Sequence, residues 1–406
     1  LGLSLAASGQ VADMEFTGDI VANVGDLDAL SAFAGRPLGG SLDLSASGSV
    51  SPLAGGFDLD VEGTARDIVL GDPRLDALLA GQTTLSGGAV RDAQGFRTEG
   101  LELQNPQLQV SSNGVYSQSR TDIGLEAALN DLAAIDPRLS GAVTLDASAQ
   151  GEGRQIELNA DASIPDGQLL DRAVSGLDLS FDGRLDGTDL TGQIDGGGQL
   201  DALVIDLQGA LGLTSEGRSL RNLEASIGGN RLTGDILRRP DGLFDGDISL
   251  DAPDLASLGA LGLIEADGRA SADVRLSEDA GAQNVSIVAE ATDASIAGNS
   301  IGSLEANLSI ADAFSLPLPE GTLNAPDIAA GTVAISSVMI DAQRPDDDAT
   351  QFSAQARLPI GTLIDASAGL EQTADGFTAT LGDLRLRQGD QAATLIEPAT
   401  VTLSGG

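Results

Sequence analysis

The stretch LVIDLQGALGL (203–213) shows the pattern that decides the fold of this chain. Its apolar residues Leu203, Ile205, Leu207 and Leu211 come at even spacings, with polar or small residues between most of them. Successive side chains of a β-strand point to opposite faces, so this spacing predicts a strand with one apolar face and one wet face.

The same period of two recurs along most of the chain. It is clearest in SLDLSASG (41–48), FDLDVEG (57–63), IELNADASI (156–164) and LDLSFDG (177–183). One wet face indicates an antiparallel sheet, because parallel sheets are usually covered on both sides and read as continuous apolar runs. Short breaks rich in Gly and Asp predict the hairpins between strands. They include QGEG (150–153), GRLDG (183–187) and RPDG (239–242).

A second kind of segment interrupts the strands. Residues 27–50, 129–151 and 253–276 each show a short turn of helix, a Gly or Pro break and then a strand, and 75–95 is a weaker relative. Their spacing is uneven, so they form a degenerate repeat and not a solenoid of fixed period. They predict a few short helices inserted in the sheet.

The number of strands constrains the architecture. A sheet of roughly thirty strands cannot stay flat, because twist accumulates and open sheets rarely exceed about ten strands without curling. Aromatic residues make up only 2% of the chain, which leaves little to fill a thick core. We therefore predict an all-β fold, a long antiparallel meander curled into an elongated, taco-like or β-helix-like groove with a few short helices.

The pattern also suggests a division of the chain. We predict a repetitive β-groove segment at 1–310, a possible loop or linker region at 311–350, and a continuing groove segment at 351–406.

Charge excludes some partners. The chain carries 61 acidic and 21 basic residues, a net charge of −40. A nucleic-acid backbone would repel it, and no basic stripe is present to release counterions. The same charge argues against adhesion to an anionic membrane surface.

Missing residue types exclude much of enzyme chemistry. The chain has no His and no Cys, so it cannot build a Ser-His-Asp triad, a Cys-His pair or a His/Cys zinc site. It also has no Lys, which removes the P-loop and the Schiff base. Carboxylate pairs are available, but Asp mostly alternates with aliphatic residues or lies in turns, as on a solvated strand face. We predict no catalytic residue, no cofactor and no metal.

Calcium offers one alternative, because acidic, Gly-rich β proteins without Cys are often calcium-loaded adhesins. The nearest match to a calcium-binding nonapeptide is GGGQLDAL (196–203), where Gln199 replaces a glycine and no second copy follows. The segment PDDD (345–348) is a plausible weak cation site, although an exposed acidic loop is the more common explanation.

The aliphatic faces point to a different ligand. A continuous trough of Leu, Ile, Val and Ala with an acidic exterior would solvate an acyl chain inside and stay soluble outside. Packing inside an ordinary β-sandwich is the alternative for these residues. The predicted lining consists of Leu42, Leu44, Phe57, Leu59, Val61, Val143, Leu145, Ile156, Leu158, Leu177, Leu179, Phe181, Leu203, Ile205, Leu207, Leu211, Ile248, Leu250, Val285 and Ile287.

Three of these segments also resemble a known family. LDALSAFAGRPLGGSLDLSASGSV (27–50), RLDALLAGQTTLSGGAVRDAQGFRTEGLELQNPQLQVSSNGVYS (74–117) and DLAAIDPRLSGAVTLDASAQGEG (131–153) resemble the middle region of TamB proteins from alphaproteobacteria, which belong with the AsmA-like and repeating β-groove proteins. The resemblance covers most of the chain and is clearer up to about residue 280.

This resemblance implies a location and partners. It implies a periplasmic part of an inner-membrane-anchored protein, a phospholipid cargo, and an outer-membrane barrel partner of the Omp85 type (TamA) that binds outside this segment. It also implies a role in autotransporter assembly and secretion. The chain begins and stops in mid-pattern, so we expect an interior fragment without the anchor.

Three functional hypotheses follow. The first is a periplasmic bridge that conducts phospholipid acyl chains between inner and outer membrane. The second is a scaffold that offers a sheet edge as a template for outer-membrane β-proteins and binds no lipid. The third is a calcium-stabilised surface adhesin.

Overall fold

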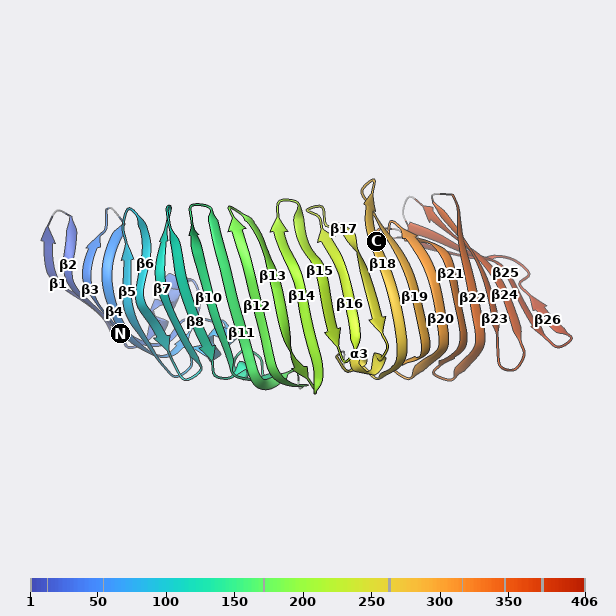
Figure 1. Cartoon of the computed structure of the whole chain (residues 1–406), viewed down its shortest axis with the longest axis horizontal. Coiled ribbons are helices and arrows are strands. Elements are labelled where there is room, and N and C mark those ends of the chain that lie inside the picture. Colours follow the sequence, from blue (N-terminus) through green and yellow to red (C-terminus); the bar gives the residue numbers. More distant parts are fainter. Residues whose placement is uncertain are drawn as a thin grey trace. The chain divides into compact units, whose positions relative to one another are not determined.

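The computed structural model describes residues 2–12, 14–53, 55–170, 172–261, 264–315, 317–346, 348–373 and 376–404. In these residues the chain forms 27 strands and a few short helices, and it divides into two units, 1–204 and 205–406 (Figure 1). Consecutive strands pair antiparallel, and the sheet does not close on itself. The predicted fold class, an all-β antiparallel meander with a few short helices, is confirmed.

The first unit contains thirteen strands before the boundary strand β14. They are β1 (Leu3–Ala12), β2 (Glu15–Val24), β3 (Gly39–Ser51), β4 (Gly56–Val69), β5 (Gln82–Arg91), β6 (Gly95–Gln104), β7 (Leu108–Ser117), β8 (Thr121–Leu129), β9 (Leu139–Gly141), β10 (Val143–Glu152), β11 (Gln155–Leu169), β12 (Arg172–Asp186) and β13 (Asp189–Leu200). The simple order changes once, where β10 pairs with β8 and the short β9 pairs with β11.

The second unit continues the meander from β14. Its strands are β14 (Leu203–Thr214), which starts just before the boundary, β15 (Gly217–Ile227), β16 (Asn230–Arg238), β17 (Phe244–Ala252), β18 (Ala266–Asp279), β19 (Ala282–Ile296), β20 (Asn299–Ala311), β21 (Leu318–Ala330), β22 (Val333–Asp346), β23 (Ala349–Arg357), β24 (Leu363–Thr373), β25 (Gly376–Gln388), β26 (Gln391–Thr394) and β27 (Ala399–Ser404). Both β26 and β27 pair with β25.

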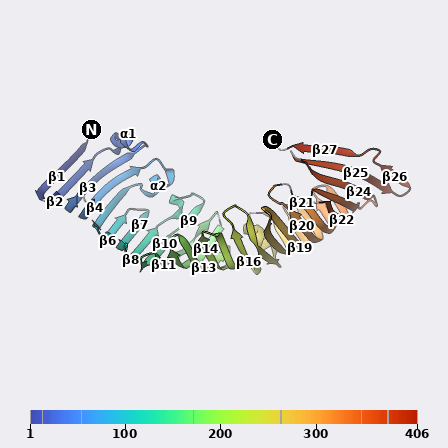
Figure 2. The same ribbon diagram turned by 90° about the horizontal axis from the view of Figure 1, so that it is seen from above.

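Short helices occur in all four segments where the sequence predicts them. They are η1 (Leu27–Leu30), α1 (Ser31–Ala34), α2 (Pro73–Leu78), η2 (Leu132–Ala134) and α3 (Leu255–Leu261). Asp supplies the N-cap of three of them, as when the Asp72 carboxylate accepts the Arg74 N–H ahead of α2. In the first unit α1 and α2 lie on the same side of the sheet (Figure 2).

The segment 311–350, predicted as a possible loop or linker region, contains two long strands. Strands β21 and β22 pair with each other and with their neighbours β20 and β23. Two prolines of this segment, Pro319 and Pro326, are accommodated within β21. The boundary between the two units lies within β14.

Several strands are bent by bulges in which one residue takes the left-handed conformation. Asp67, Asn222, Asp293 and Asp327 have φ between 49° and 53°. Asp and Asn are the side chains that tolerate this region best, and a bulge increases the local bend and twist of its strand. The Asn222 N–H is held by the Asp235 carboxylate at 2.7 Å. Some of the acidic residues therefore stabilise the bends of the strands.

Glycines allow close backbone approach in the first unit. Gly9, Gly18 and Gly48 face one another in register across β1, β2 and β3. Gly48 has φ of 140°, and a Cβ added there would overlap the Asp58 carbonyl oxygen. This conformation is open to glycine alone.

Replacing Gly48 by Ala is therefore expected to destabilise the chain by about 1–3 kcal/mol, the usual cost of a forced backbone conformation. Gly124→Ala is the matched control, because its nearest additional contact would be the Asn113 carbonyl at an ordinary 3.9 Å. Urea unfolding followed by circular dichroism measures both. Equal midpoints for the two variants would contradict the role assigned to Gly48.

Candidate apolar groove

The strand register aligns the apolar residues of the first unit into one row across the sheet. Cross-strand partners lie on the same face, so the strand register identifies which side chains are neighbours. The row crosses twelve strands, which at about 4.8 Å per strand amounts to about 50 Å, and every residue in it is apolar or Gly. It reads Leu5, Ala22, Leu44, Gly63, Leu85, Leu103, Val110, Ala127, Leu145, Ala162, Leu179 and Gly196.

The second unit contains an apolar row of the same kind. It reads Leu207, Ala225, Leu232, Leu250, Ala272, Ala289, Ala306, Leu323, Ile340, Ala354, Ala366 and Leu384. A parallel row beside it contains Leu223, Gly234, Ile248, Val274, Ile287, Leu308, Gly321, Ala342, Phe352, Ala368, Leu381 and Ala399. We call these rows the apolar stripe of each unit.

The predicted lining residues lie on these apolar faces. In the first unit the register places all twelve up to Phe181 on one face, including pairs such as Ile164 with Leu177 and Ala160 with Phe181. In the second unit it places Ile205, Leu207, Leu211, Ile248, Leu250, Val285 and Ile287 on one face. Leu203 begins β14 in step with Ile205. Whether these residues contact lipid stays a prediction.

The stripe is open to solvent. Leu179 is 46% exposed and Leu207 is 39% exposed, while most of their neighbours in the rows are half-buried. A second sheet packed face to face would bury such residues, as the interior of a β-sandwich does. Within each unit, nearly all of the substantial contacts between elements of the described residues join neighbouring strands or involve a short helix. An open apolar face therefore fits these units better than stacked sandwiches.

Most of the well-buried apolar residues lie outside the stripes, and some of them mark the strand ends near the short helices. In the described part of the chain, twelve apolar residues are buried. Val24, Leu129 and Ala252 each end a strand that leads into a short helix, and Leu132 is in η2 itself. The helices thus anchor the ends of strands and leave the middle of the apolar face uncovered.

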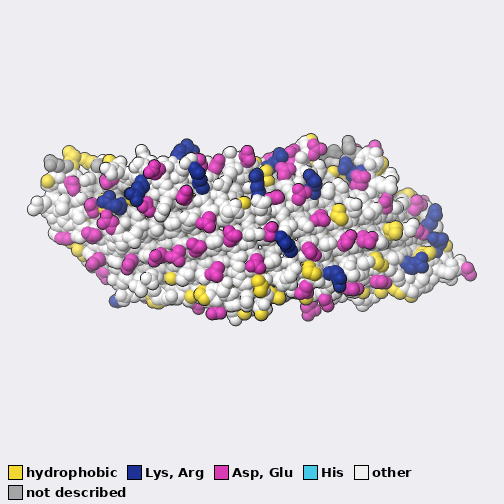
Figure 3. Space-filling view, viewed as in Figure 1, with side chains coloured by type: hydrophobic (Ala, Val, Ile, Leu, Met, Phe, Trp, Pro, Cys, Tyr) yellow, Lys and Arg dark blue, Asp and Glu magenta, His cyan; other side chains and the backbone are white. Residues whose placement is uncertain are grey.

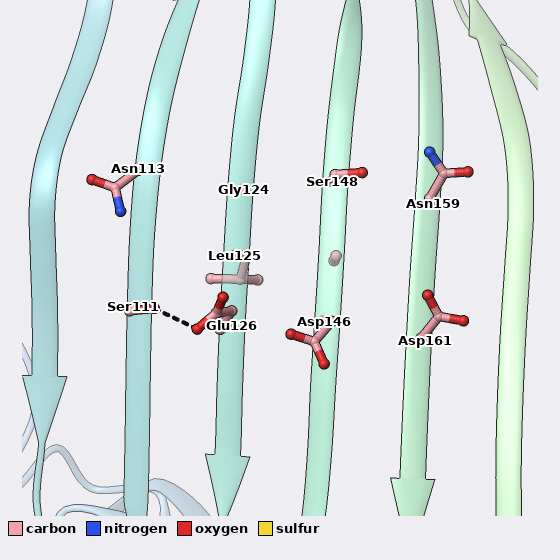
Figure 4. Close-up of a pocket in the computed structure, with 10 residues that line it drawn as sticks. Ser111, Asn113, Gly124, Leu125, Glu126, Asp146, Ser148, Asn159 and Asp161 are labelled. Atoms are coloured by element: carbon pink, nitrogen blue, oxygen red, sulfur yellow. Dashed lines mark hydrogen bonds between the residues drawn. The ribbon is translucent and has the colours of Figure 1, made fainter.

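The opposite face is polar and acidic. The face seen in Figure 3 carries many acidic and few hydrophobic side chains. In the first unit Glu126, Asp146 and Asp161 face one another in register and line a shallow hollow of about 240 Å³ with Ser111 and Asn113 (Figure 4). The Ser111 hydroxyl donates to Glu126 at 3.5 Å. Among the described residues, no three carboxylates are placed to share a metal ion.

The two calcium-like segments fold as follows. Residues 196–203 run from β13 through a turn into β14. In PDDD (345–348), Asp346 ends β22, and Asp347 lies outside the described residues.

Carboxylates with lowered pKa belong to turns and strand ends. The hydrogen bond from the buried Arg172 guanidinium lowers the pKa of Asp201. The side chain and backbone N–H of Arg138 lower the pKa of Asp136 to about 2. These groups are held as charged anchors of turns, outside the apolar stripes, so they provide no acid or base within the stripe.

Sequence reasoning missed two features of these faces. One is the set of Ala positions in the lining, since the predicted lining residues include no Ala although Ala272, Ala289 and Ala306 lie side by side in the second stripe. The other is the arginines that share the apolar register, Arg91 in the first unit and Arg218 and Arg238 in the second. The sequence RSLRNLE (218–224) could have predicted this for Arg218, because Arg218 and Leu220 are two residues apart and therefore point to the same face of a strand.

No family model, curated protein or solved structure was found to match the chain. The family resemblance drawn from the sequence therefore stays a prediction. Among the described residues, no helix has the length and hydrophobicity needed to cross a bilayer.

If the apolar face is open, truncating an exposed side chain on it should destabilise the chain less than truncating a buried one. Leu207→Ala should destabilise the second unit by under about 1.5 kcal/mol, because the side chain is already 39% exposed. Leu223→Ala, at a position 8% exposed on the same face, should cost about 2–5 kcal/mol. Urea midpoints measure the difference, and a loss at Leu207 as large as that at Leu223 would show that the face is covered.

Proposed function

We propose that the apolar stripes bind the acyl chains of phospholipids and that the chain is a segment of a lipid-conducting groove. The observation that carries the proposal is the row of apolar residues that crosses twelve strands in each unit without a polar side chain. Each CH₂ removed from water contributes about 0.8 kcal/mol, so even a shallow stripe can hold an acyl chain.

The chemistry of the stripe favours conduction over storage. Dispersion and hydrophobic contacts have no preferred direction, so an acyl chain that moves from one strand to the next exchanges one set of Leu and Ala contacts for an equivalent set. A hydrogen-bonding group in the row would hold a ligand in place, and the rows contain none. The acidic opposite face keeps the segment soluble.

The resemblance to TamB-like proteins supplies the setting of the proposal. In that setting the segment lies in the periplasm, belongs to a protein anchored in the inner membrane, and passes phospholipid toward the outer membrane. The partnership with an Omp85-type barrel (TamA) and the role in autotransporter assembly belong to the same proposal, and that partner would bind outside this segment.

Crosslinking tests the proposal directly. A photo-crosslinking residue at Leu158 or Leu207, introduced in cells, should capture phospholipid, and solvent extraction of the purified chain should release it. The matched controls are Glu157 and Asp206, which are the adjacent residues on the polar face. Mass spectrometry identifies the adducts. A chain that carries no lipid and gives no adduct at either apolar position would refute the proposal.

A charge in the stripe should block lipid binding. Leu207→Asp places a carboxylate where an acyl chain would have to desolvate it, so we expect at least a tenfold loss of affinity for a fluorescent phospholipid. Gln208→Asp introduces a new carboxylate at the next position, on the opposite face, and should leave binding unchanged. Fluorescence titration measures both variants, and urea midpoints show whether they remain folded. Equal affinities would contradict a role for this face.

A further inference from the structure

Two arginines in the second unit lie directly opposite each other at one end of the apolar face. Arg218 of β15 pairs in register with Arg238 of β16. Their neighbours along the same row are Leu213 of β14 and Phe244 of β17. Both arginine side chains are exposed. The row thus combines two positive charges with apolar residues on either side.

This pair is unfavourable unless something else stabilises it. Like charges directly opposite on neighbouring strands repel each other. Other arginines of the unit have carboxylate partners, such as Arg231 with Glu224 at 2.7 Å and Arg239 with Glu278 at 2.9 Å. In the part of the chain that the structure describes, no carboxylate pairs with Arg218 or Arg238, although acidic residues outnumber basic ones 61 to 21.

The residues beside the arginine pair are held in place by hydrogen bonds and ring packing. The Gln283 side chain is 1% exposed, accepts the Phe244 N–H at 2.7 Å and donates to the Phe244 carbonyl at 3.0 Å. The Phe244 ring packs edge to face against Phe314, with centroids 6.0 Å apart, and Phe314 is 62% exposed. Aromatic surface beside the arginines is therefore fixed in place.

The strands connect this pair to the apolar stripe. Along β16 the residues on the apolar face run from Arg238 through Ile236 and Gly234 to Leu232, which belongs to the stripe. Six residues of strand span about 20 Å. An amphiphile with a phosphate at Arg238 would thus have a continuous apolar path for its hydrocarbon.

We propose that Arg218 and Arg238 bind the phosphate of a phospholipid headgroup while its acyl chains lie on the adjoining apolar face. Arginine forks match phosphate oxygens in bidentate geometry, and a bound phosphate removes the repulsion between the two guanidinium groups. The net charge of −40 repels anions at long range, so an anionic headgroup needs a local positive site to be held. The inference rests on the proposed function and adds a headgroup site to it.

The same combination recurs in the first unit. Arg91 pairs in register with Phe57 on one side and Phe96 on the other, again on the apolar face, and its side chain is exposed. The two phenylalanine rings are 6.4 Å apart and meet edge to face. Strands β4 and β6 are two strand spacings apart, about 9.6 Å, so the rings lean toward each other across β5. An exposed arginine beside aromatic residues thus occurs on the apolar face of both units.

The test compares two lipids that differ in the headgroup. Fluorescent phosphatidylglycerol and fluorescent diacylglycerol with the same acyl chains are titrated into the full chain and into the double variant Arg218→Gln/Arg238→Gln. We expect the unmodified chain to bind phosphatidylglycerol about tenfold more tightly than diacylglycerol, a difference of about 1.4 kcal/mol. The double variant should lose this preference and keep its affinity for diacylglycerol.

A matched control changes the same charge elsewhere. Arg231→Gln/Arg275→Gln removes two exposed arginines in the polar register of β16 and β18 and should keep the preference for phosphatidylglycerol. Since Arg218 and Arg238 repel each other, their replacement should leave the urea midpoint unchanged or raise it, which separates lost binding from lost folding. A control that loses the preference as fully as the double variant would overturn the assignment to this pair.

The remaining outcomes separate the two proposals. Equal binding of both lipids by the unmodified chain, or a preference that survives in the double variant, overturns the headgroup site and leaves the proposed groove standing. Failure of both lipids to bind overturns both proposals. Displacement of phosphatidylglycerol by millimolar inorganic phosphate, with loss of this effect in the double variant, would identify a site for free phosphate and overturn the assignment to a lipid headgroup.

Discussion

The structure depends on cross-strand register, because register decides which side chains share a face. A slip of one residue between any two strands would carry every apolar residue of one strand to the acidic side. The pairing of Ala127 with Leu145, and of Leu145 with Ala162, keeps three strands in step at the centre of the first stripe. The stripe is therefore a product of many independent pairings and of no single residue.

Bulges and glycines bend this sheet without breaking the apolar face. Between Leu220 and Leu223 the register of β15 shifts, yet both residues remain on the apolar face because the bulge at Asn222 absorbs the extra residue. The Asp235 carboxylate fixes that bulge by accepting its N–H. Acidic residues thus have two roles: many keep the polar face hydrated, and some stabilise the bulges that bend the strands.

Local pattern was enough to predict the strands and the short helices, since alternation and a turn of helix are properties of neighbouring residues. The segment 311–350, predicted as a possible loop or linker region, contains Pro319, and the structure accommodates this proline within β21 although proline usually interrupts strands. The cross-strand neighbours of Arg218 could not be predicted from the sequence. Its position beside Arg238 depends on register across a hairpin, and the bulge in β15 makes that register hard to count from the sequence.

The size of the apolar stripe and the charge of the chain limit which molecules can bind to the stripe. A row of about 50 Å with residues spaced about 7 Å along each strand covers roughly 350 Å² of the sheet face, and the second unit has two such rows. Apolar patches of this size are among the largest on monomeric proteins and are often functional. A second copy of the chain would bring another net charge of −40 against the first, which opposes self-association. Uncharged hydrocarbon meets no such repulsion, so the charge and the stripe together favour an acyl chain over another copy of the protein.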